Sequence, residues 1–120
     1  MELEKTFLEE FEGAQEQLEK ERFKNAAILF SKALFALCDL IIYSKLNKLP
    51  KNHGERFRIL KEYFPEIYSG VDNIFSHYTD AYSKPVLKET CEKIKIPIAA
   101  SCGVFLMFTM NQKSLQAVGY

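Results

Sequence analysis

A long apolar segment, residues 22–48, constrains the fold of this chain more than any other part of the sequence. Apolar residues recur along it at spacings of three and four, as on the buried side of a helix; they are Phe23, Ala26, Ala27, Phe30, Ala33, Leu34, Leu37 and Ile41. Three further apolar residues, Ile28, Phe35 and Ile42, stand seven apart on the more polar side. We therefore predict a long buried helix with a second contact through Ile28, Phe35 and Ile42.

Helical periodicity also surrounds this segment. Residues 2–20 carry one narrow apolar stripe, and the short polar join at residues 21 and 22 predicts an antiparallel hairpin with the long helix. After a loop rich in turn residues, helices are expected at 56–64 and 67–78, and a fifth is expected to begin at Ser83 as its cap, with Pro85 in its first turn. The fold class predicted is all-α, an up-and-down antiparallel bundle of four to five helices.

The composition changes at residue 96, where a run without charge extends to residue 110. This run is shorter than the roughly 20 residues that span a bilayer, so no transmembrane span is predicted from it. We divide the chain into a bundle domain at 1–95 and an apolar C-terminal segment at 96–120, packed on the same domain or at a dimer interface. Periodicity leaves open whether this segment is a helix kinked at Pro97 or irregular around Gly103.

Charge and cysteine content limit the classes of function. Sixteen acidic residues balance sixteen basic ones, which argues against a broad phosphate-binding face. Cys38, Cys91 and Cys102 form no CxxC pair, and the N-terminus has no signal-peptide pattern. These features favour a reduced, cytoplasmic protein whose thiols pack as small apolar groups.

Few residues of the sequence could bind a metal ion or a cofactor. The chain has two histidines, His53 and His77, and it has no HExxH motif or carboxylate–histidine run with ligand spacing. It also has no glycine-rich phosphate loop of the GxxxxGK[ST] or GxGxxG type. We therefore expect no metal site and no cofactor.

The first concentration of polar residues is the sequence NHGER at residues 52–56. His53 and Arg56, three apart, share a face if the helix has begun at His53, and together they could bind a phosphate or a carboxylate. The alternative is structural, with Asn52 or His53 capping the helix and Arg56 paired with a nearby acid.

The second concentration lies at residues 77–84 and contains His77, Tyr78, Asp80, Tyr82 and Lys84. These side chains could line a groove in which a nucleotide base stacks on tyrosine and its phosphate meets Lys84. Alternatively, this is a helix end with half-buried tyrosines whose hydroxyls face water.

Three stretches together resemble a HEPN domain (higher eukaryotes and prokaryotes nucleotide-binding) of the small archaeal and bacterial type. They are FKNAAILFSKALFALCD at 23–39, NHGERFRILKEYFP at 52–65 and YTDAYSKP at 78–85. The resemblance implies an up-and-down bundle that commonly dimerises. In one branch of that family, an arginine four to six residues before a histidine cleaves RNA. Arg22, Arg56 and Arg58 are the arginines here, and none precedes a histidine at that spacing.

The missing motif places the resemblance with the noncatalytic branch, and no catalytic residue is assigned. That branch implies a homodimer that binds a nucleotide or a nucleotidyltransferase partner, in a toxin–antitoxin-like or substrate-binding role. Its expected groove comprises the residues of the 77–84 concentration, with His53 and Arg56 as a second set, and Ile28, Phe35 and Ile42 are the candidate dimer contacts. Two alternatives remain: a ribonuclease toxin with a displaced set such as His77 and Arg56, and a structural helical adaptor.

Overall fold

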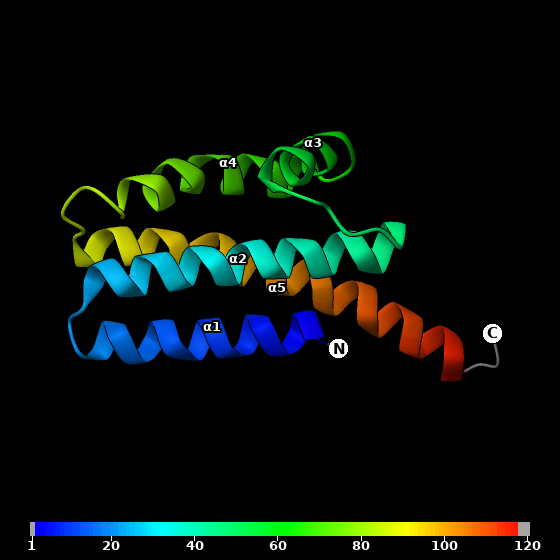
Figure 1. The fold of residues 1–120 in the computed structure, drawn as a ribbon. Helices are drawn as coiled ribbons and strands as arrows, with labels where there is room; N and C mark the ends of the chain where they lie inside the picture. The colour runs from blue at the N-terminus through cyan, green and yellow to red at the C-terminus, as the bar shows by residue number, and fades with distance from the viewer. Residues whose placement is uncertain (1, 118–120) are drawn as a thin grey trace.

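The structure is a computed structural model that describes the backbone of residues 2–117 and the side chains of residues 2–106. Over that range the chain forms five α-helices and no strand, which confirms the predicted all-α bundle. The helices are α1 (Glu2–Glu19), α2 (Phe23–Leu46), α3 (His53–Tyr63), α4 (Pro65–Asp80) and α5 (Lys88–Ala117). Figure 1 shows α2 in the middle, with α1 on one side, α3 and α4 on the other, and α5 behind it.

The predicted hairpin of α1 and α2 is present. Glu21, with φ of 58°, lies between the two helices and takes the left-handed conformation that reverses the chain. Ala14 of α1 is fully buried, and the ring of Phe11 meets the edge of Phe30 with centroids 5.6 Å apart. The narrow apolar stripe of α1 therefore packs on α2 as the sequence predicts.

Helix α2 is the core of the bundle. Most of its residues are buried, and Asn47 ends it in a left-handed conformation with its N–H donating to the Tyr43 carbonyl at 2.8 Å. By length and composition alone α2 could cross a membrane, but 72% of its apolar window is buried inside the protein. Its apolar character is thus accounted for by the neighbouring helices.

The second contact of α2 is made largely within the chain. Phe35 is 4% exposed and Ile42 is fully buried, because α3 and α4 cover this side of α2. Ile28 is half-buried and packs against the same core. Phe35 and Ile42 therefore cannot act as surface contacts with a second copy in this fold, contrary to the prediction.

The loop and cap before α3 agree with the predicted turn chemistry. Asn52 is the N-cap, and its side-chain oxygen accepts a hydrogen bond from the Glu55 N–H at 2.9 Å. The helix begins at His53, three residues earlier than predicted, while Pro65 opens α4. His53 and Arg56 accordingly lie on one helical turn.

Helix α5 differs from the prediction at its start. It begins at Lys88, because the N–H groups of Ser83 and Lys84 bond back to the Asp80 carbonyl and extend α4 as a turn. Ser83 is thus not a helix cap.

The C-terminal half of α5 belongs to the bundle as far as its side chains are described. The helix passes through Pro97 and Gly103 without a break, so the boundary drawn at residue 95 falls inside a helix. Ile98 is 3% exposed and Ser101 is 2% exposed. The side chains of the predicted segment from residue 107 to 120 lie outside the described residues.

Candidate functional site

An ion pair between α2 and α3 lies at the centre of the candidate site. Arg56 Nε donates to Asp39 Oδ1 at 2.7 Å, and Arg56 Nη2 donates to Asp39 Oδ2 at 2.9 Å. The two side chains are only 12% and 13% exposed. This bidentate arrangement, the stronger form of an arginine–carboxylate pair, fixes α3 against α2. The sequence left open a structural alternative, in which Asn52 caps the helix and Arg56 pairs with a nearby acid. The structure contains both contacts.

His53 completes the environment of the guanidinium. Arg56 Nη1 lies 2.6 Å from His53 Nδ1, which accepts a hydrogen bond when the ring proton is on Nε2. The imidazole meets the edge of Phe35 with ring centroids 5.0 Å apart. Burial, and then the charge of Arg56, lower the pKa of His53, so the neutral imidazole is favoured.

Tyr78 of α4 approaches the same rings, and Tyr82 lies in the turn that follows α4. Tyr78 meets Phe35 edge-on at a centroid distance of 5.2 Å and lies 6.1 Å from His53. Its hydroxyl is 3.3 Å from that of Tyr82, whose side chain is largely exposed. Burial, followed by the hydrogen bond with Tyr82, raises the pKa of Tyr78 to about 12.

The two polar concentrations of the sequence therefore meet around Phe35. We call the resulting surface the aromatic face; it comprises Phe35, His53, Phe57, Phe75, Tyr78 and Tyr82. Helices α2, α3 and α4 contribute to it, and Tyr82 comes from the turn after α4. Phe35–Tyr78, Phe57–Phe75 and Tyr78–Tyr82 pack edge to face, and Tyr82 is the exposed end of the face.

The remaining predicted residues are placed differently. Lys84 Nζ lies 3.5 Å from Asp80 Oδ1 just beyond Tyr82, and both side chains are more than half exposed. His77 is half-buried, and among the described residues no hydrogen bond, ion pair or ring contact joins its side chain to Arg56 or to the aromatic face. No described contact therefore brings His77 and Arg56 together, as the alternative of a displaced catalytic set would require.

Two acidic residues of this region were not predicted. Asp39 lies four residues after Phe35 on the same side of α2, and that spacing is a signal that could have identified it as the acid for Arg56. Glu10 of α1 has a buried Oε2 with no hydrogen-bond partner among the described residues, and burial raises its pKa against the opposing effect of Lys32. Its place three after Phe7 and four before Ala14 puts it on the inward stripe of α1.

Metal binding finds no support in the part of the chain that the structure describes. No group of three or more histidine, cysteine or acidic side chains lies together there. Burial raises the pKa of Cys38 to about 12 and raises those of Cys91 and Cys102, so the thiols stay protonated.

No family model, curated protein or solved structure matches the chain.

Proposed function

We propose that this chain is a noncatalytic HEPN-type helical domain that binds a nucleotide at the exposed end of its aromatic face. The observation that carries the proposal is the convergence of His53, Arg56 and Tyr78 around Phe35, with Tyr82 packed against Tyr78. These groups come from segments far apart in the sequence. The HEPN resemblance, which rests on the same segments, supports a nucleotidyltransferase as the protein beside which such a domain acts.

The chemistry of the exposed end suits a base and a phosphate. Tyr82 is 56% exposed and is held at right angles to Tyr78, so its ring offers a fixed surface on which a base can stack. Lys84, two residues further along, offers an ammonium group to a phosphate. Its pairing with Asp80 is exposed, and pairs of that kind contribute little, so a phosphate can compete for Lys84.

The state of Arg56 supports a noncatalytic role. RNA cleavage by the ribonuclease branch requires a basic group free to reach the scissile phosphate and an imidazole free to exchange a proton. Here the guanidinium is held by both carboxylate oxygens of Asp39 and by His53, and it is nearly buried. Three of the five guanidinium N–H donors of Arg56, and Nδ1 of His53, are thus already engaged within the protein.

Calorimetric titration with ATP tests the proposal. Tyr82→Ala should weaken ATP binding roughly 5- to 150-fold, because base stacking on an aromatic ring contributes about 1–3 kcal/mol. Lys84→Ala should weaken it less and reduce its dependence on salt. The matched controls are Tyr43→Ala, which removes another exposed tyrosine, and Lys51→Ala, which removes an exposed lysine outside the site. Absence of ATP binding, or equal losses in Tyr82→Ala and Tyr43→Ala, would refute the proposal.

An RNA-cleavage assay separates this proposal from the ribonuclease alternative. Purified protein incubated with single-stranded RNA should leave it intact, and expression should not be toxic. Cleavage that is lost in His77→Ala and retained in Tyr82→Ala would instead favour a displaced catalytic set.

A further inference from the structure

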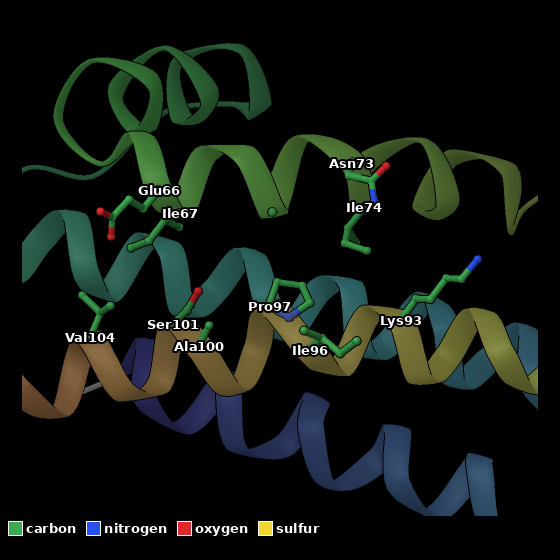
Figure 2. Close-up of a pocket in the computed structure, with 11 residues that line it drawn as sticks. Glu66, Ile67, Asn73, Ile74, Lys93, Ile96, Pro97, Ala100, Ser101 and Val104 are labelled. Carbon is green, nitrogen blue, oxygen red and sulfur yellow. The ribbon is translucent and has the colours of Figure 1, made fainter.

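An apolar groove of about 540 Å³ lies between α4 and α5, on the side of the molecule where α5 is in front of α2 (Figure 2). Its walls are mostly small or aliphatic side chains: Ile67, Gly70, Ile74, Pro97, Ala100 and Val104. None of these residues belongs to the aromatic face, because α4 turns Phe75 and Tyr78 toward α2 and turns this row toward α5. The groove is thus a second, separate surface.

The groove has a narrow waist and a raised edge. At the waist Gly70 faces Pro97, and a Cβ on Gly70 would lie 3.4 Å from the Pro97 Cβ. Next to Pro97, on the side toward Lys93, Ile96 of α5 is 69% exposed, the largest exposed fraction among the large apolar residues described (Figure 2). A small ligand inside the groove would leave Ile96 in water, whereas a second protein surface would cover both.

The apolar surface continues past the end of the groove at Glu66 and Val104. A second hollow of about 240 Å³ shares Glu66, Ile67 and Val104 with the groove and reaches Tyr63, which is 55% exposed. The surface is therefore elongated along α4 and α5, which favours a protein face as its occupant.

The charges at the two ends identify which protein face fits. Glu66 of α4 stands at one end of the groove and Lys93 of α5 at the other, as Figure 2 shows. Both are exposed, and neither makes an ion pair with the described residues. A groove that is negative at one end and positive at the other is complementary to itself when a copy is rotated by half a turn.

We propose that this groove docks the same groove of a second copy of the chain in an antiparallel, two-fold contact. Ile96 of each copy enters the groove of the other near Ile67 and Val104, and Glu66 of each copy pairs with Lys93 of the other. The contact is independent of nucleotide binding, because the aromatic face lies on the other side of α4. It replaces Ile28, Phe35 and Ile42 as the dimer surface.

Charge reversal tests this contact on the full chain by analytical ultracentrifugation over a concentration series. The wild type should form a dimer. Glu66→Lys alone and Lys93→Glu alone should each weaken it more than about tenfold, because each places like charges together twice per dimer. The double variant Glu66→Lys/Lys93→Glu should restore the dimer, and an equimolar mixture of the two single variants should form a mixed dimer.

Controls separate the contact from folding and from the proposed function. Glu12→Lys, an exposed reversal on α1, should leave the dimer unchanged, and circular dichroism should show that every variant is helical. Ile96→Asp should give a helical monomer that still binds ATP as the wild type does. A monomeric wild type, or a dimer that tolerates both single reversals, would overturn the contact. Failure of ATP binding alone would bear only on the nucleotide proposal.

Discussion

The guanidinium of Arg56 lies in a bidentate contact with the carboxylate of Asp39, seventeen residues earlier in the chain. The pair joins the middle helix of the bundle to the first turn of α3. Because the pair is nearly buried, its two charges depend on each other far more than those of a surface pair do.

Asp39→Ala should therefore destabilise the protein by roughly 3 kcal/mol, since it leaves Arg56 charged and without its partner in a poorly hydrated position. Replacing both residues, as Asp39→Leu/Arg56→Met, should cost less than Asp39→Ala alone. Urea denaturation measures both. The control is Glu62→Ala, which breaks the exposed pair of Arg58 and Glu62 and should cost less than about 1 kcal/mol. Equal losses in Asp39→Ala and Glu62→Ala would contradict this assignment.

His53 should make stability depend on pH. Burial and Arg56 lower its pKa below the ordinary value of 6.5, so below that pH the unfolded chain takes up a proton that the folded chain resists. This contribution is fully present above pH 6.5 and is lost as the pH falls toward the folded pKa. Thermal melts between pH 8 and 5 should show the loss in the wild type, and a smaller one in His53→Gln, which cannot titrate. Identical pH profiles would show that His53 is not the responsible group.

Phe35 should behave as a core residue and not as a surface contact. Its ring packs against His53, Phe57, Phe75 and Tyr78. Phe35→Ala should cost about 3–5 kcal/mol, and Phe35→Asp should prevent folding, because it buries a charge among aromatic rings. Leu87→Asp, at a side chain that is 64% exposed, should be tolerated. A Phe35→Asp variant that is soluble, and folded by circular dichroism, would show that this residue lies at the surface.

Gly70→Ala should stabilise the bundle slightly. The new methyl group would meet Pro97 at ordinary contact distance, and alanine removes the conformational cost of a glycine within α4, about 0.5–1 kcal/mol. Thermal denaturation measures the gain. Gly13→Ala, at a helical glycine of α1 with a Leu29 methyl group 3.5 Å from the new position, provides the comparison. A loss in Gly70→Ala with a gain in Gly13→Ala would mean that α4 and α5 need the closer approach.

The periodic helices could be predicted from sequence because each buries one side. The stripe on α1 and the three-and-four spacing on α2 correspond directly to the packing that forms. The start of α5 could not be predicted from sequence. Ser83 and Pro85 carry a valid cap signal, yet the backbone of residues 83 and 84 is already hydrogen-bonded to the end of α4. The helix through Pro97 was undecidable, since its residues are apolar on every side.

The candidate site was predicted in its parts and not in its arrangement. The sequence identified His53, Arg56, Tyr78 and Tyr82 as polar concentrations, but it could not show that Phe35 brings them together, since that depends on how α3 and α4 cross α2. For the same reason Phe35 was assigned to an external contact. Helical spacing states which residues share a side and leaves open which helix covers that side.

The order of the helices has a consequence for synthesis. Helix α5 follows the other four helices in sequence, and it covers α2 behind the plane of α1 and α4 (Figure 1). Until residues 88–106 have left the ribosome, the nascent chain exposes the side of the apolar helix α2 that α5 later covers. Chains that terminate near residue 95 would keep that surface open to chaperones, proteases and lipid, so a truncated product would be cleared or would aggregate instead of surviving as a smaller bundle.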